Sequence, residues 1–315
     1  MKIFHPTILH IIYSWRCNLK CRHCHNDSGA DKTDKLETEN LIALLPSAAA
    51  AGITHVALLG GEIFLYPEVI EEMIKESHRN NLSVGIVSNG YWGKSIESAR
   101  STINLLKRSG WDPKIDSLLC SVGDYHQEWL PISSVKTAIT EYYSAFNYPV
   151  KLQVESVTTD LDTFRTFFAD IEPASFLIVR ELDSLYRFGR EEPLEVSADK
   201  MKFYKDIRGC GYFEWLEIIP TGSLFPCPGF NDNNPTLSFG NLNTMTDATE
   251  MIKKANESFI IKLLMNTELR TIYSTILSTH PELPKFFSHR CEICEIICNE
   301  KYRDELITAF PNILG

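Results

Sequence analysis

Short apolar runs alternate with longer helix-like segments from about residue 7 to residue 180, and this alternation constrains the fold most. The apolar runs cover 7–13, 55–60, 82–88, 114–122, 150–157 and 175–179, and segments with apolar residues at helical spacing cover 37–52, 67–80, 94–110, 133–146 and 160–170. Strands that alternate with helices form parallel sheets with right-handed crossovers. The pattern therefore predicts an α/β fold, either a doubly wound sheet or a partial (β/α)6 barrel.

Polar motifs follow four of the predicted strands. Three cysteines follow the first run, Gly-Gly-Glu the second, Ser-Asn-Gly the third and Gly-Asp-Tyr-His-Gln-Glu the fourth. In both candidate folds, functional groups lie on the loops after the carboxyl ends of the strands. We therefore expect the functional site at that edge of the sheet.

The cysteines after the first strand, Cys17, Cys21 and Cys24, have the spacing C-x3-C-x2-C. An iron–sulfur cubane is normally held by four thiolates, so three leave one iron open to another ligand. A structural zinc would take a further Cys or His as its fourth ligand, and His23 and His25 flank Cys24. The spacing is not the C-x2-C pair usual in zinc sites, and the position after a strand is typical of an active site. These points favour the cluster over a Cys3His zinc site.

Composition excludes several classes of protein. The 315 residues include 31 basic and 41 acidic side chains, and no Lys/Arg cluster forms a phosphate-binding surface, so we expect no nucleic-acid partner. No apolar run reaches the roughly 18–20 residues of a membrane span, so we expect no membrane partner. The apolar N-terminus lacks a cleavage site and reads as a buried strand. Nine cysteines without a secretion signal argue against a disulfide framework and for a cytoplasmic protein.

The cysteine motif followed by Gly-Gly-Glu resembles the radical S-adenosylmethionine (radical SAM) superfamily, over about residues 7–180. The resemblance implies a partial (β/α)6 barrel of the TIM type. It also implies a [4Fe–4S] cluster on Cys17, Cys21 and Cys24, with SAM bound to the open iron. In that family an electron from the cluster cleaves SAM to methionine and a 5′-deoxyadenosyl radical, which takes a hydrogen atom from the substrate. An electron donor such as flavodoxin or ferredoxin is implied as a partner.

The same resemblance assigns residues to SAM. Gly60, Gly61 and Glu62 match the stretch that receives the methionine amino group, which fits the close approach that glycines permit. The further predicted contacts are Ser88 and Asn89 of Ser-Asn-Gly, Ser121 of a Ser-x-Asp pattern, Glu155 and Arg180. This chain departs from the Ser-x-Asp pattern, because the third position is Gly123 and the acid, Asp124, comes one residue later. An Asn-Gly turn and a solvated strand-end glutamate are the alternative interpretations of Asn89 and Glu155.

Two side chains outside these sets are of interest. His126 follows the fourth strand, where a histidine can bind substrate or transfer protons, or can be a satisfied core or capping residue. Cys120 stands alone within the fourth strand, and we expect it to be a small buried apolar residue.

The C-terminal part changes character. We divide the chain into a core (1–180), a charged linker with a helix (181–209) and a second domain (210–315). A β-hairpin over 212–227 and helices over 246–280 are expected in the second domain. With its cysteines, it resembles the SPASM/Twitch extensions of radical SAM enzymes.

The C-terminal part has five cysteines, one more than the four ligands of a single cluster. The resemblance implies one auxiliary [4Fe–4S] cluster on Cys210, Cys227, Cys291 and Cys294, with a structural zinc as the alternative. Cys298 is then left over, and its thiol can give a hydrogen atom to a substrate radical, which would make the enzyme an epimerase. In the alternative, Cys298 completes the cluster and another cysteine is spare.

The leading functional hypothesis is a radical SAM oxidoreductase or epimerase that acts on an unactivated C–H bond. A ribosomally made peptide is the favoured substrate, and an aminocyclitol or sugar of a natural-product pathway is the alternative. The first strand begins close to Met1, so we expect no peptide-recognition domain before it. A non-catalytic zinc- or cluster-binding module is the hypothesis of a different class.

Overall fold

The computed structural model describes residues 1–155, 165–182, 190, 201–210, 213–229, 232 and 235–313. For Glu155 and residues 179–182 it describes the backbone alone. Much of the predicted helix at 160–170 and most of the predicted linker at 181–209 therefore lie outside the described residues.

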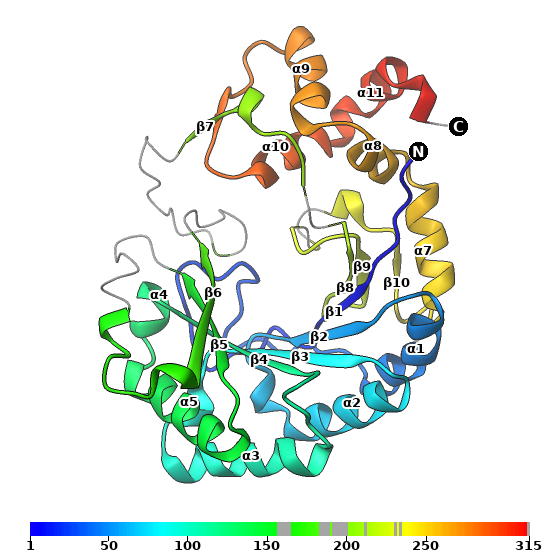
Figure 1. Ribbon diagram of the computed structural model, residues 1–315. Helices are drawn as coiled ribbons and strands as arrows, with labels where there is room; N and C mark the ends of the chain where they lie inside the picture. Colours follow the sequence, from blue (N-terminus) through cyan, green and yellow to red (C-terminus); the bar gives the residue numbers. More distant parts are fainter. Residues whose placement is uncertain are drawn as a thin grey trace.

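Six parallel strands form a curved sheet in the order β1-β2-β3-β4-β5-β6, and the longer helices between them cover its outer face (Figure 1). The strands are β1 (Ile8–Ile12), β2 (His55–Leu59), β3 (Ser83–Ser88), β4 (Ser117–Gly123), β5 (Val150–Glu155) and β6 (Phe176–Leu182). The helices are α1 (Thr38–Ala50), α2 (Pro67–Arg79), α3 (Ile96–Ser109), α4 (Asp124–Gln127) and α5 (Ile132–Phe146). The predicted partial (β/α)6 barrel is confirmed, and each strand begins and ends within three residues of its predicted bounds.

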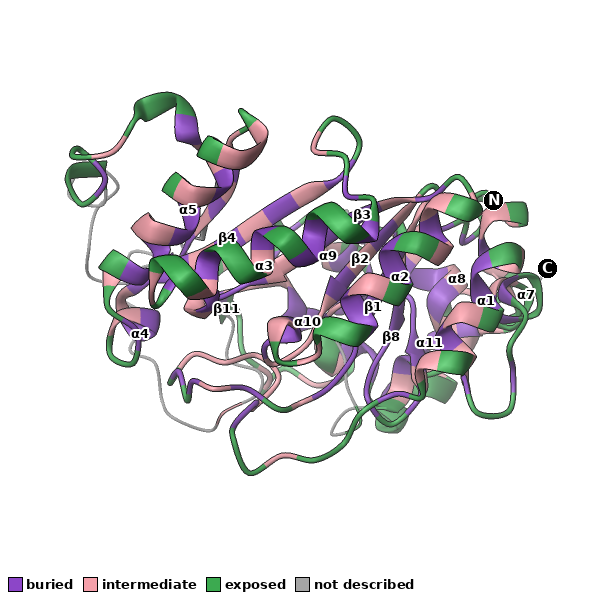
Figure 2. Cartoon of the chain, turned by 90° about the horizontal axis from the view of Figure 1, so that it is seen from below, coloured by how far each residue is buried: buried purple, intermediate pink, exposed green. Residues whose placement is uncertain are grey.

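Side chains alternate between the two faces of these strands. Leu9 and Ile11 of β1 and Val56 and Leu58 of β2 pack in one core with the inward faces of the helices. Figure 2 shows the result, with buried strands and with helices exposed on their outer faces. Cys120 of β4 is fully buried in this core, which confirms its prediction as a small apolar residue.

The predicted hairpin extends the same sheet. Its strands are β8 (Trp215–Ile218) and β9 (Ser223–Phe225), followed by β10 (Gly240–Asn241). Gly222 forms the turn with φ of 86°, a left-handed conformation that favours glycine. Because β8 pairs in parallel with β1, the described residues form one nine-stranded sheet that crosses the predicted boundary between the domains.

A second core lies among the C-terminal helices, and the N-terminal Phe4 is buried within it. The helices are α7 (Ala248–Glu257), α8 (Phe259–Asn266), α9 (Leu269–Thr279), α10 (Arg290–Ile297) and α11 (Arg303–Ala309). A two-stranded sheet of β7 (Lys202–Phe203) and β11 (Phe286–Phe287) packs beside them. Short 3₁₀ helices are η1 (Ile63–Leu65), η2 (Tyr91–Gly93), η3 (Pro173–Ser175), η5 (Tyr204–Asp206), η6 (Pro235–Leu237), η7 (Glu300–Tyr302) and η8 (Pro311–Ile313).

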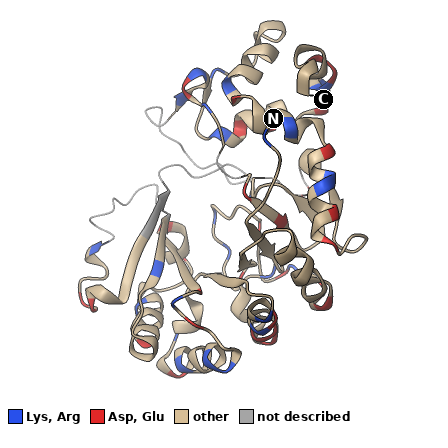
Figure 3. Cartoon of the chain, turned by 45° about the vertical axis from the view of Figure 1, so that its right-hand side comes forward, with Lys and Arg blue, Asp and Glu red and all other residues tan. Residues whose placement is uncertain are grey.

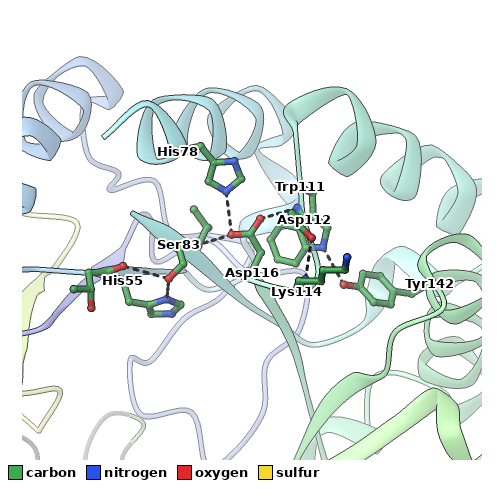
Figure 4. Close-up of polar contacts among 10 residues, drawn as sticks. His55, His78, Ser83, Trp111, Asp112, Lys114, Asp116 and Tyr142 are labelled. Atoms are coloured by element: carbon green, nitrogen blue, oxygen red, sulfur yellow. Dashed lines mark hydrogen bonds and ion pairs between the residues drawn. The ribbon is translucent and has the colours of Figure 1, made fainter. Parts of the chain in front are cut away.

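A polar network closes the end of the barrel at which β3 and β4 begin (Figure 4). The buried carboxylate of Asp116 accepts hydrogen bonds from His78 Nε2 at 3.0 Å and from the Val84 amide at 2.8 Å. His55 Nδ1 and Ser83 Oγ lie 2.8 Å apart beside them. The functional site is therefore expected at the opposite edge of the sheet, where the strands end.

Charged residues of both signs lie on the outer helices (Figure 3). Several form ion pairs between neighbouring helices, such as Arg108 of α3 with Glu71 of α2 at 2.8 Å. Among the described residues, no helix has the length and apolar character needed to cross a membrane.

Candidate active site

The three cysteines lie on the loop between β1 and α1 (Figure 1, blue). Backbone hydrogen bonds join the two arms of this loop: Leu36 donates to Tyr13 at 2.9 Å, Gly29 to Trp15 at 3.1 Å, and Cys17 to Gly29 at 3.0 Å. The loop is thus closed at its base, and the cysteines lie at and beyond the last of these bonds.

N–H groups are directed at two of the sulfur atoms. The Leu19 amide lies 3.4 Å and Asn89 Nδ2 3.8 Å from Cys17 Sγ, and the Ser28 amide lies 3.3 Å from Cys24 Sγ. Burial raises the pKa of the Cys17 thiol to about 12, so its thiolate needs a positive partner such as iron. Hydrogen bonds to sulfur are a feature of iron–sulfur sites. The donor set therefore fits the three-thiolate cluster that the sequence predicts.

The Gly-Gly-Glu segment after β2 lies against the cysteine loop. The Gly61 amide donates to Ser14 O at 2.6 Å, and the Glu62 amide to Arg16 O at 3.0 Å. A Cβ atom at Gly61 would lie 2.3 Å from Arg16 O and 2.8 Å from Cys17 Cβ. At Gly60 it would lie 3.2 Å from Ser14 O. Gly61 in particular is needed here because the two backbones touch.

Glu62 joins this segment to the Ser-Asn-Gly segment after β3. Its buried carboxylate accepts hydrogen bonds from the Phe64 amide at 3.0 Å, Ser88 Oγ at 3.0 Å and the Asn89 amide at 2.8 Å. Burial raises the pKa of this carboxyl to about 7, against the lowering effect of these bonds. Glu62, Ser88 and Asn89 thus meet beside Cys17, and their contact with SAM stays a prediction.

The other predicted SAM residues lie on β4, β5 and β6. Ser121 lies between Cys120 and Val122, which face the outer core, so its side chain is on the inner face of the sheet. Glu155 pairs with Gly123 in register, and Arg180 lies on β6, but their side chains are outside the description. Their predicted roles remain untested.

Helix α4 packs on the cysteine loop. The His23 ring lies 4.8 Å from the His126 ring and 5.2 Å from the Tyr125 ring. The Arg22 guanidinium lies 4.6 Å from the centre of the Tyr125 ring, and its Nε is 3.1 Å from Glu128 Oε1. His126 is therefore a buried neighbour of the residues between Cys21 and Cys24, and its catalytic role stays a prediction.

One residue at this loop was missed by the sequence analysis. Arg190, in the segment predicted as a linker, contacts the backbone around Cys21 and Cys24. Contacts to backbone carbonyls leave no pattern in a single sequence. Only the preceding Gly189 and the charged segment around it could have drawn attention to Arg190.

The C-terminal cysteines gather in the second core. Burial raises the pKa of the Cys227 thiol well above its usual value, and the thiols of Cys294, Cys210 and Cys291 raise it further. Cys298 is buried, with 2% exposure, and its Sγ lies 3.9 Å from Cys294 Sγ. Within the described part of the chain, no three Cys, His, Asp or Glu side chains converge as the ligands of a single metal ion.

A partial barrel with three cysteines on its first loop, tied to Gly-Gly-Glu on its second, defines a radical SAM domain. Residues 11–161 match the family model of the radical SAM superfamily. This part of the chain is therefore a radical SAM domain, and the family implies a [4Fe–4S] cluster and SAM at the three cysteines.

Two relatives show how far sequence similarity extends. YydG of Bacillus subtilis (strain 168), described as a peptide biosynthesis protein, is 26% identical over 306 aligned positions, and the match covers 90% of this chain and 89% of YydG. Human molybdenum cofactor biosynthesis protein 1 is 30% identical over 237 aligned positions, and the match covers 71% of this chain but 36% of that protein.

Two solved structures share the fold. Streptococcus suis SuiB bound to S-adenosylmethionine has a TM-score of 0.51 at 16% identity, over 73% of this chain and 62% of SuiB. Native anSMEcpe, with bound AdoMet and a Kp18Cys peptide, has a TM-score of 0.54 at 16% identity, over 98% of this chain and 99% of anSMEcpe. The likeness to anSMEcpe covers the C-terminal part as well as the barrel.

Proposed function

We propose that this chain modifies a ribosomally made peptide at an unactivated C–H bond. The observation that carries the proposal is the similarity to YydG, a peptide biosynthesis protein by its description, over nearly the whole of both chains. The anSMEcpe structure with a bound peptide supports it, because the fold likeness to that protein also spans the whole chain. We further propose that the enzyme works in the cytoplasm with flavodoxin or ferredoxin as electron donor.

Cys17, Cys21 and Cys24 would hold the [4Fe–4S] cluster, and SAM would take its open iron. When bound, the two together supply the electron and the 5′-deoxyadenosyl radical that removes a hydrogen atom from the substrate. The proposed SAM contacts are Gly60, Gly61, Glu62, Ser88, Asn89, Ser121, Glu155 and Arg180. We propose that His126 moves protons at the substrate, on the side of the site that α4 covers.

We propose a single auxiliary [4Fe–4S] cluster on Cys210, Cys227, Cys291 and Cys294, within a Twitch-like domain over 210–315 that follows a linker at 181–209. The neighbouring thiols around Cys227 support this set. Cys298 lies next to it, beside Cys294.

Two outcomes remain for the substrate radical. In epimerisation, Cys298 Sγ gives its hydrogen atom to the carbon radical, and the resulting thiyl radical regains the thiol by taking one electron from the electron donor and one proton from water. In oxidation, the radical loses an electron to the auxiliary cluster and a proton to a base. Both outcomes follow from the same hydrogen abstraction, so one experiment can separate them.

The test uses a synthetic peptide encoded beside the gene, with reduced enzyme and SAM in D2O. Epimerisation gives a product that has gained one deuterium at the inverted carbon, and Cys298→Ala then stops deuterium uptake. Oxidation gives a product that has lost two hydrogen atoms. Formation of 5′-deoxyadenosine that rises with an aminocyclitol but not with the peptide would contradict the proposed substrate class.

A further inference from the structure

Arg190 is bound to the loop of the three cysteines. Its Nε donates to Cys21 O at 3.0 Å, a terminal nitrogen donates to Ser28 O at 2.5 Å, and its backbone amide donates to Cys24 O at 3.1 Å. The side chain is 10% exposed. The guanidinium therefore spans the loop from the second cysteine to a residue beyond the third.

The turn that Arg190 spans has a conformation that needs support. Asp27 has φ of 46°, in the left-handed region that non-glycine residues seldom adopt. Its carboxylate lies 3.4 Å from Arg190 Nη1 and 2.9 Å from Lys32 Nζ. The Asp27 carboxylate thus lies between two cations, and the Arg190 guanidinium brings a positive charge to the loop that carries Cys21 and Cys24.

The loop is held from a second side by α4. Arg22 and His23, between Cys21 and Cys24, pack on Tyr125 and His126, so this side of the loop is already fixed. Arg190 binds the backbone carbonyls instead. The contacts with α4 fix the side chains of the loop segment that carries the second and third cysteines, and the contacts with Arg190 fix its backbone.

We infer that Arg190 is a positioning residue for the cluster: it holds the Cys21–Ser28 turn in its ligating shape, and its charge eases reduction of the cluster. The inference rests on the proposed cluster at Cys17, Cys21 and Cys24. A cationic group near an iron–sulfur cluster stabilises its more negative, reduced form, so net charge and hydrogen bonding set the reduction potential. Arg190, which follows β6 in the chain, thereby becomes part of the redox site on the loop after β1.

The test compares Arg190→Gln and Arg190→Lys with Arg100→Gln as the matched control. Arg100 is 67% exposed and pairs with Glu141 on the outer helices, away from the loop. After anaerobic reconstitution, the first measurement is the rate at which a chelator removes iron from the cluster whose electron paramagnetic resonance spectrum responds to SAM. The second is the reduction potential of that cluster.

Arg190→Gln is expected to release iron about tenfold faster, on the scale of one lost charge-assisted hydrogen bond, and to shift the potential to more negative values. Arg190→Lys should restore the potential but only part of the retention, because an ammonium cannot span both carbonyls. Unchanged release, or faster release with an unchanged potential in Arg190→Gln, would overturn the inference. A wild-type chain that binds no SAM-responsive cluster would instead overturn the proposed function.

Discussion

At Gly61, the absence of a side chain lets the end of β2 lie directly on the cysteine loop. Gly61→Ala would place a Cβ 2.3 Å from Arg16 O and 2.8 Å from Cys17 Cβ. Overpacking of this kind costs about 1–3 kcal/mol or more, and here the loop must move. We expect Gly61→Ala to lose the SAM-responsive cluster, as measured by iron content and SAM-dependent resonance spectra.

Gly209→Ala is the matched control, because a Cβ there would meet no atom within 4 Å. It should keep its full iron content. Full iron content in Gly61→Ala would show that the loop tolerates the added methyl group, and equal iron loss in both variants would show that the contact at Gly61 is not the cause.

The titration of Glu62 should make the free energy of unfolding depend on pH. Because burial raises the pKa of its carboxyl from 4.5 to about 7, the folded chain binds this proton more tightly than the unfolded chain. The stability that this proton contributes is fully present below pH 4.5 and is lost as the pH rises through about 7, and it amounts to roughly 3 kcal/mol. Urea unfolding of the metal-free chain should therefore give a free energy of unfolding that falls over this range.

Glu62→Gln provides the comparison, because its side chain does not titrate. The variant should show a flatter dependence of the free energy of unfolding on pH between 4.5 and 7. It should also be less stable, because its NH2 group faces N–H and O–H donors that the carboxylate accepts. An unchanged slope would assign the dependence to another group.

At the scale of elements, α10 carries the cysteines that distinguish the two candidate ligand sets. Cys291 and Cys294 lie within it, and Cys298 is its C-terminal cap, with its Sγ 3.9 Å from Cys294 Sγ. We expect Cys294→Ala to lose the iron of one cluster and Cys298→Ala to retain it, because the proposed ligands are Cys210, Cys227, Cys291 and Cys294. Iron loss in Cys298→Ala equal to that in Cys294→Ala would make Cys298 a ligand.

The elements also show what the sequence could and could not predict. Apolar periodicity located the strands of the barrel, because each strand buries alternate residues against its own helix. Gly61 and the cysteines were found because their spacing is itself the signal. The binding of Arg190 to Cys21 O and the pairing of β8 with β1 were not, since both join segments far apart in the chain through backbone groups, which all residues share.

At the scale of the whole molecule, the N-terminus joins the two cores. Phe4 is fully buried among the C-terminal helices, and its amide donates to Asn256 Oδ1 at 2.7 Å. Phe4→Ala should lower the free energy of unfolding by about 3–5 kcal/mol. Its neighbour Ile3 is 66% exposed, so Ile3→Ala should change stability little. Similar losses in both variants, measured by urea unfolding, would argue against this packing.

Reductive cleavage of SAM tests the central claim most directly. The reconstituted wild-type chain, treated with dithionite and SAM, should form 5′-deoxyadenosine and methionine. Cys17→Ala should form none, because the loop would lose one of its three thiolates. Cys120→Ala, which removes a thiol buried in the barrel core, should keep the activity in the folded fraction. Full cleavage by Cys17→Ala would contradict the assignment of the three-cysteine loop as the site at which SAM is cleaved.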